Sequence, residues 1–126
     1  MKLRDKFQIL TIAGKGRGVA AAMPLHVGEV LEIAPTVLLN AEECSHVEQT
    51  ALGNYYFAHP SSEDDGLIIL GIASLLNHSE TPNAEVTWCD DPHLGLIAVL
   101  RALKPIATGE EITRRYRCHP WFPVAA

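Results

Sequence analysis

The sequence predicts a mainly β protein that forms one domain over residues 1–126. Short apolar or alternating runs are separated by turn-forming residues along the whole chain, and a single stretch carries a strong helix-start signal. Hydrophobic residues make up 48% of the chain and charged residues 20%, a composition typical of globular proteins. A chain of 126 residues can bury a core without disulfides or metals.

The first expected strand is residues 7–12, where apolar and polar side chains alternate. It ends at three glycines in alternate positions, Gly14, Gly16 and Gly18. Glycine permits positive φ angles and lets a ligand approach the backbone closely. The patterns of phosphate-binding loops are missing from this stretch, and Gly-x-Gly is equally compatible with a tight hairpin turn.

Residues 27–35 and 36–39 are expected to form two further short strands, separated by a proline. The best helix signal follows directly. Asn40 is a good N-cap, and Glu43 stands where a capping box places its acidic residue. A helix is therefore predicted from residue 41 to about residue 50.

Three strand segments follow the helix. Residues 55–57 form an aromatic cluster that belongs either to the core or to the wall of a pocket. Residues 67–70 indicate a buried strand, and residues 85–88 and 94–99 a hairpin. A turn bracketed by proline and glycine then leads into a short strand that ends on Tyr116.

A polar tract follows the apolar residues 71–76. It reads Asn77-His78-Ser79, with Pro82-Asn83 shortly after. Asn offers a donor and an acceptor, and His has two distinct ring nitrogens, so such groups at the edge of a core are suited to hold a ligand. On these residues alone, a loop between two strands is the simpler interpretation.

The formal charge of −5 argues against direct binding to nucleic acid and favours a basic partner. Cys44, Cys89 and Cys118 are odd in number and widely spaced, which indicates reduced thiols and no structural metal site. No apolar run approaches the length of a membrane span, and the N-terminal residues lack the pattern of a signal peptide. We expect an intracellular protein that does not bind membranes.

Three motifs, taken together and in this order, resemble those of SET-domain protein lysine methyltransferases. They are Gly16-Arg17-Gly18-Val19, then Asn77-His78-Ser79 with Pro82-Asn83, then Gly109-Glu110-Glu111-Ile112-Thr113 ending in Tyr116. The compact length, and the lack of a cysteine-rich segment after Tyr116, look most like the minimal, viral-type members of this family.

The resemblance implies a fold of the β-clip type, with small curved sheets, one or two short helices, and a C-terminal segment threaded beneath a loop near the polar tract. It also implies S-adenosylmethionine as cofactor. The implied cofactor-binding residues are Gly16, Arg17 and Gly18, with Asn77 at the methionine part, His78 at the adenine end and Trp121 covering the adenine.

The same resemblance assigns catalysis to Tyr116 and Tyr55, and a substrate channel to Tyr55, Phe57 and Tyr116. Transfer of a methyl group from a sulfonium to an amine needs alignment and exclusion of water, without a metal. One departure bears on substrate preference. The family often has an acidic or small residue just before the catalytic tyrosine, whereas Arg114-Arg115 precedes Tyr116 here.

The predicted function is thus protein-lysine N-methylation of a basic protein, such as a histone or histone-like protein. A SET-like interaction module that has lost turnover is the alternative. With no zinc-binding tail, the far wall of the channel must come from residues 116–126 or from a second subunit, which favours a homodimer.

Overall fold

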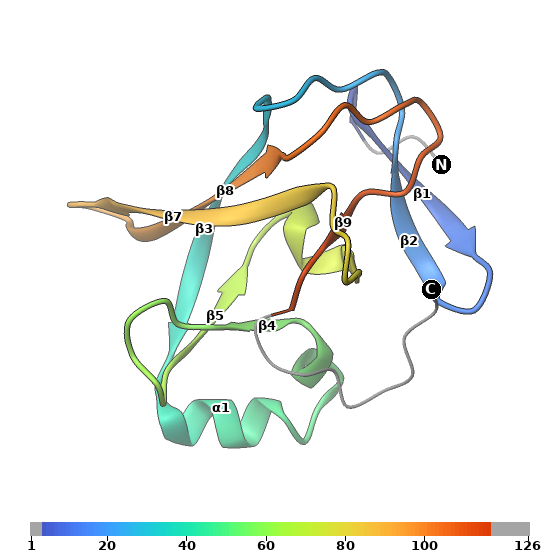
Figure 1. Ribbon diagram of the computed structural model, residues 1–126. Helices are drawn as coiled ribbons and strands as arrows, with labels where there is room; N and C mark the ends of the chain where they lie inside the picture. Colours follow the sequence, from blue (N-terminus) through green and yellow to red (C-terminus); the bar gives the residue numbers. More distant parts are fainter. Residues whose placement is uncertain (1–3, 117–126) are drawn as a thin grey trace.

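The computed structural model describes residues 4–116 and confirms a mainly β fold (Figure 1). The strands, in chain order, are β1 (Phe7–Ile12), β2 (Gly16–Ala21), β3 (Val30–Leu39), β4 (Tyr56–Ala58), β5 (Gly66–Ile69), β6 (Asn77–His78), β7 (Ala84–Asp91), β8 (Gly95–Ala102) and β9 (Thr113–Arg114). The helical elements are α1 (Ala41–Val47) and two 3-10 helices, η1 (Ala51–Asn54) and η2 (Ile72–Leu75). Among residues 4–116, no helix is long and apolar enough to cross a membrane.

The strands form three small sheets. The largest is antiparallel, in the order β4-β5-β3-β8-β7, and β1 and β2 form a separate antiparallel hairpin. The third sheet consists of β6 and β9, which run parallel. In Figure 1, β9 lies between the five-stranded sheet and the β1–β2 hairpin. The C-terminal part of the described chain is therefore drawn into the middle of the fold, as the family resemblance implied.

The prediction of two short strands on either side of Pro35 is wrong, because β3 is continuous. Its first half pairs with β8 as far as Pro35, and its second half pairs with β5 from Thr36 onward. Pro35 stands where one pairing gives way to the other. A residue without an N–H is tolerated at such a junction, and its carbonyl still accepts a hydrogen bond from Leu70 N at 3.0 Å.

The predicted capping box is confirmed. Asn40 Oδ1 accepts a hydrogen bond from Glu43 N at 2.8 Å, and Glu43 Oε1 accepts one from Asn40 N at 3.0 Å. The helix ends at Val47, earlier than expected, and the chain turns into η1. Thr50 caps η1 by accepting a hydrogen bond from Leu52 N at 3.2 Å, so a second N-cap interrupts the helix.

A single cluster of buried side chains connects the sheets. It includes Phe7 and Val19 of the first hairpin, Leu67 and Ile69 of β5, and Leu100 of β8. Leu76 and Ile112 belong to the same cluster. Because each directly precedes one strand of the β6–β9 pair, core packing fixes where both strands begin.

A buried carboxylate holds the start of η2. Glu32, on β3, is only 7% exposed, and its two oxygens accept hydrogen bonds from Ile72 N at 2.8 Å and Ala73 N at 3.2 Å. Gly71 leaves the space for it, since a Cβ at that position would lie 2.5 Å from Glu32 Oε1. Glu32 thereby fixes the segment that leads into β6.

We predict that Glu32→Ala lowers the free energy of unfolding by about 2 to 3 kcal/mol, because two buried amides lose their acceptors. Chemical denaturation measures the change. Glu85→Ala, on the exposed face of β7, is the matched control and should change stability by less than about 0.5 kcal/mol. Equal effects of the two substitutions would contradict the role given to Glu32.

Candidate functional site

The polar tract and the C-terminal strand are joined by backbone and side-chain hydrogen bonds. In the parallel ladder, Asn77 pairs with Thr113 and His78 with Arg114. Asn83, at the other end of the tract, forms hydrogen bonds with the same segment. Its Nδ2 donates to the Glu111 carbonyl at 2.8 Å, and its Oδ1 accepts from Thr113 N at 2.9 Å.

Asn77 also connects this pair of strands to the β1–β2 hairpin. Its Nδ2 donates to the Arg17 carbonyl at 3.2 Å and to Glu111 Oε2 at 2.7 Å. Gly18 makes this approach possible, because a Cβ there would lie 2.9 Å from Glu111 Oε2 and 3.0 Å from Asn77 Nδ2. The second glycine of Gly-x-Gly is thus required by side-chain packing, whereas Gly16 has a positive φ of 79°.

A cleft of about 470 Å³ opens beside these contacts. Its lining comes from the turn after β1, from η1 and η2, and from the two paired strands: Lys15, Arg17, Asn54, Tyr55, Ser74, Leu75, Leu76, Asn77 and Tyr116. Lys15 Nζ forms an ion pair of 3.0 Å with Glu111 Oε1. Basic, amide and tyrosine side chains therefore line one cleft.

Tyr116 is held in the cleft wall by contacts at both ends. Its backbone N–H donates to His78 Nδ1 at 2.9 Å, its ring packs edge-on against the His78 ring, and its hydroxyl donates to the Leu76 carbonyl at 3.2 Å. Because His78 Nδ1 accepts a hydrogen bond, Nε2 carries the ring proton and donates to Glu80 Oε1 at 2.9 Å. His78 is thus a neutral support for Tyr116.

The hydroxyl of Tyr116 remains protonated at neutral pH. Burial raises its pKa above the usual value, and the nearby positive charge of Arg114 acts in the opposite direction. A tyrosine hydroxyl that donates one hydrogen bond can also accept one, so a hydroxyl in this position has the chemistry to orient an amine.

Tyr55 directly follows η1 and lines the same cleft as Tyr116. Arg17 Nη2 donates to the Tyr55 hydroxyl at 3.0 Å, and the Arg17 guanidinium lies 6.0 Å from the Tyr55 ring centroid. The first hairpin and the aromatic segment are therefore connected across the cleft through two predicted site residues.

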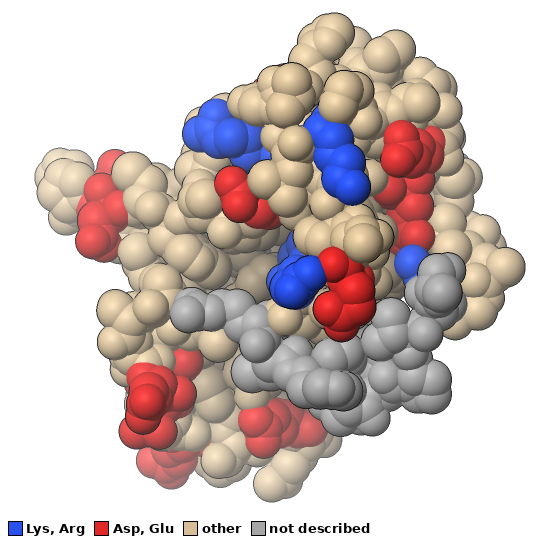
Figure 2. All heavy atoms as spheres, viewed as in Figure 1, with Lys and Arg blue, Asp and Glu red and all other residues tan. Residues whose placement is uncertain are grey.

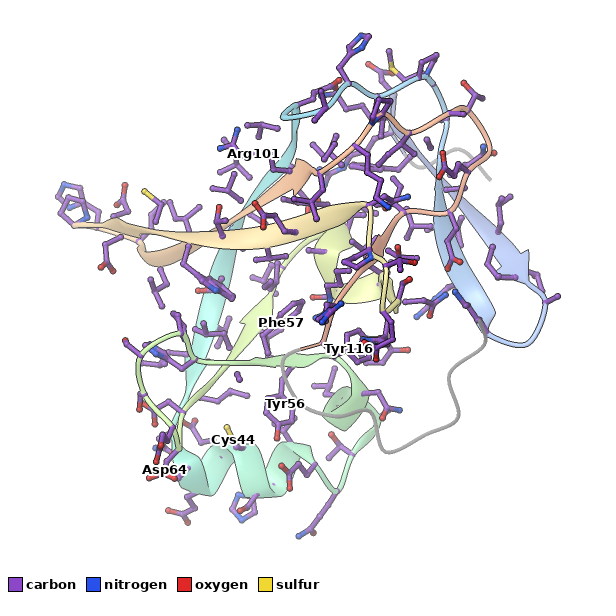
Figure 3. The ribbon with its side chains drawn as sticks, in the orientation of Figure 1. Cys44, Tyr56, Phe57, Asp64, Arg101 and Tyr116 are labelled. Carbon is purple, nitrogen blue, oxygen red and sulfur yellow. The ribbon has the colours of Figure 1, made fainter. Side chains whose placement is uncertain are left out.

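Arg114 occupies a position that sequence reasoning did not assign to the site. Its guanidinium carbon lies 3.9 Å from the Phe57 ring centroid and 4.2 Å from that of Tyr116, so the cation is stacked between the two rings. The residue is 9% exposed, and burial lowers its pKa to about 10. Figure 3 shows Phe57 and Tyr116 as neighbours at the centre of the molecule.

Four predicted site residues meet in the cleft lining: Arg17, Tyr55, Asn77 and Tyr116. Gly16 and Gly18 lie at the start of β2, next to the lining residue Arg17. His78 and Phe57 lie behind the lining, in contact with Tyr116 and with Arg114 respectively. Trp121 lies outside the described residues.

The sequence analysis missed Lys15, Glu111 and Arg114 as site residues. Glu111 was visible as part of the Gly-Glu-Glu motif and Lys15 as the residue between two glycines, but neither pattern indicates that they form an ion pair. Arg114 was visible only as a departure from the family pattern.

Comparison with known proteins identifies the family of the chain. The family model of the SET domain matches residues 16–117, and the chain belongs to the SET-domain family. The crystal structure of a proposed histone methyltransferase from Plasmodium falciparum is similar, with a TM-score of 0.72 and 27% sequence identity, over 94% of this chain and 98% of that chain. No curated protein matches the sequence.

The protonated state of Tyr116 gives a spectroscopic prediction. The difference in absorbance near 295 nm between wild type and Tyr116→Phe should follow the ionisation of Tyr116, with a midpoint above the ordinary tyrosine pKa of about 10. A stopped-flow pH jump allows the measurement before unfolding. A midpoint below 10 would contradict the effect of burial at this position.

Proposed function

We propose that the chain is an S-adenosylmethionine-dependent protein-lysine N-methyltransferase that acts on a basic protein. The observation that carries the proposal is the position of Tyr116. This residue is held by His78 and Leu76 in the wall of a cleft whose lining also contains Asn77 and Arg17. Membership in the SET-domain family and the likeness to a proposed histone methyltransferase support the same activity.

The residues of the cleft fit S-adenosylmethionine. A volume of about 470 Å³ lies in the range of small-molecule sites. Lys15 and Arg17 offer positive charge for the carboxylate of the methionine part. Within residues 4–116, nothing donates to Asn77 Oδ1, which is left for the ammonium group. Asn77 would thus bond the methionine part, while contacts of His78 and Trp121 with the adenine remain predictions.

When bound, S-adenosylmethionine would supply an electrophilic methyl group to a neutral lysine amine. The amine lone pair would form the N–C bond as the C–S bond breaks with its electron pair kept on sulfur, and the methylammonium product would then lose its proton to solvent. The protein aligns the amine and excludes water. The Tyr116 oxygen and the Leu76 carbonyl are acceptors that orient the amine N–H groups. Tyr55, which lines the same cleft, would narrow the approach.

A basic substrate is consistent with the charge of the protein. The chain carries a formal charge of −5. Figure 2 shows acidic side chains gathered over α1 and at the tip of the β7–β8 hairpin. Such a surface attracts a lysine-rich segment over about 8 Å at physiological salt. A histone or histone-like protein has this chemistry, and a homodimer that completes the channel belongs to the same proposal.

The test of the proposal is methyl transfer from labelled S-adenosylmethionine to a lysine-rich peptide or a histone mixture, with the label located by mass spectrometry. We predict that Tyr116→Phe keeps the fold and the cofactor affinity but lowers turnover by a factor of about 100 or more, the scale of one lost transition-state contact.

Tyr56→Phe is the matched control, because it removes a hydroxyl that bonds Glu48, outside the cleft lining. Its turnover should stay within a factor of a few of wild type. Cofactor binding without transfer by the wild type would favour the interaction module, and a fully active Tyr116→Phe would remove Tyr116 from the mechanism.

Asn77→Ala tests the cofactor site separately. We predict that the dissociation constant for S-adenosylmethionine rises by a factor equivalent to about 1 to 3 kcal/mol, because Asn77 no longer bonds the ligand and its partner Glu111 is released. Calorimetry gives the affinity, and thermal melting of the same sample gives the stability. Asn40→Ala, which removes a helix cap distant from the cleft, should lower stability with unchanged affinity.

A further inference from the structure

Arg114 is a buried cation without an acidic partner in the part of the chain that the structure describes. The ion pairs of residues 4–116 involve Arg4, Lys6, Lys15 and Arg115, and none involves Arg114. Its Nε is buried and has no hydrogen-bond partner there. Buried charges are costly and are usually paired, so this arrangement calls for a functional reason.

We propose that Arg114 is a positioning residue for methyl transfer, whose fixed positive charge beside Tyr116 favours the neutral, nucleophilic form of the substrate amine. The inference rests on the proposed function. It gives a role to the departure from the family pattern that precedes Tyr116: the charge of Arg114 makes the bound amine lose its proton more readily before it attacks.

The geometry supports this role. The guanidinium carbon lies 4.2 Å from the Tyr116 ring centroid, on one face of the ring, while the hydroxyl of the same ring lies in the cleft wall. An amine that bonds the hydroxyl is thus separated from the cation by little more than one aromatic ring. At such a distance, inside a protein, a like charge disfavours an ammonium by an amount on the order of one pKa unit.

The stacking also fixes the position of the Arg114 guanidinium. Phe57 lies against the other face of the guanidinium at 3.9 Å and packs edge-on against Trp88. The Arg114 backbone is bound in the β6–β9 ladder, where its carbonyl accepts from Ser79 N at 3.0 Å. Cation–π attraction on both faces offsets part of the cost of burial. The slot between the two rings is filled by Arg114, so it offers no place for a second cation.

The other charged groups near Tyr116 are already engaged. Glu111 is paired with Lys15 and accepts from Asn77, and Arg17 bonds the Tyr55 hydroxyl. On the elements that pack against Arg114 and Tyr116, the titratable or charged groups are His78 and Glu80, Tyr55 and Arg17, Lys15 and Glu111, the exposed Arg115, and Glu85, Cys89, Asp90 and Asp91 of β7. Arg17 and Arg114 both lack an acidic partner within residues 4–116, but Arg17 is exposed, so Arg114 is the buried one of the two.

The first test is the pH dependence of kcat with a lysine peptide. The amine loses its proton to solvent before it attacks, so kcat rises with pH through the pKa of the bound amine. Arg114→Met removes the charge and keeps an apolar stem. We predict that the apparent pKa then rises by about one unit and that kcat near pH 7.5 falls about tenfold.

Two variants control for lost packing. Arg114→Lys keeps the charge and should keep the wild-type profile. Arg115→Met removes the neighbouring, exposed charge, which bonds Glu80, and should not move the profile. An Arg114→Met enzyme that is faster than wild type, with an unchanged pH dependence of kcat, would overturn the proposal. It would indicate instead that Arg114 blocks the channel.

The second test needs no turnover and works on the wild type. Peptides that carry lysine or its neutral isostere norleucine are titrated at pH 7 into the protein saturated with S-adenosylhomocysteine, which lacks the sulfonium charge. We predict that the norleucine peptide binds about tenfold more tightly, and that Arg114→Met loses this preference. Tighter binding of lysine by the wild type would contradict the proposal.

The two tests separate the inference from the function on which it rests. Methyl transfer with an unchanged pH profile in Arg114→Met refutes the inference and leaves the proposed function intact. A norleucine preference that depends on Arg114, in a protein without methyl transfer, supports the inference for binding and refutes the proposed function. Failure of both peptides to bind counts against both.

Discussion

Two residues of β6 lie in a parallel ladder with two residues of β9, and the site depends on this pairing. The chain must close a loop of 38 positions before the Tyr116 N–H meets His78. Such a contact is entropically costly, and a two-residue ladder cannot offset that cost alone. Asn83 adds a clasp on both sides of Ile112, and the burial of Leu76 and Ile112 anchors the two strands in the core.

The same contacts position residues of the candidate site. Asn77 hydrogen-bonds the first hairpin, and His78 hydrogen-bonds Tyr116. Both residues therefore have a structural role in addition to any contact with a ligand. The Asn77 amide nitrogen is already bonded to Arg17 and Glu111. Stability and ligand affinity are therefore coupled at these positions, and only paired measurements of melting and binding can separate them.

Local signals were readable from the sequence, and long-range ones were not. The capping box at Asn40 and the β7–β8 hairpin depend on neighbouring residues, and both are confirmed. The predicted strand break at Pro35 was wrong because the effect of a proline on strand pairing depends on which strand lies beside it. Tyr116 and Asn77 were found through the order of the motifs, whereas the ion pair between Lys15 and Glu111 joins residues 96 positions apart and left no local pattern.

Arg114 shows how an unpaired charge differs from a paired one. A carboxylate beside the guanidinium would stabilise it, but the two fields would then cancel at Tyr116. The Phe57 and Tyr116 rings stabilise the cation through their quadrupoles and carry no net charge, so they do not cancel its field at the Tyr116 hydroxyl as a carboxylate would. Stacking between aromatic rings therefore allows a buried positive charge to persist and still act on a neighbouring group.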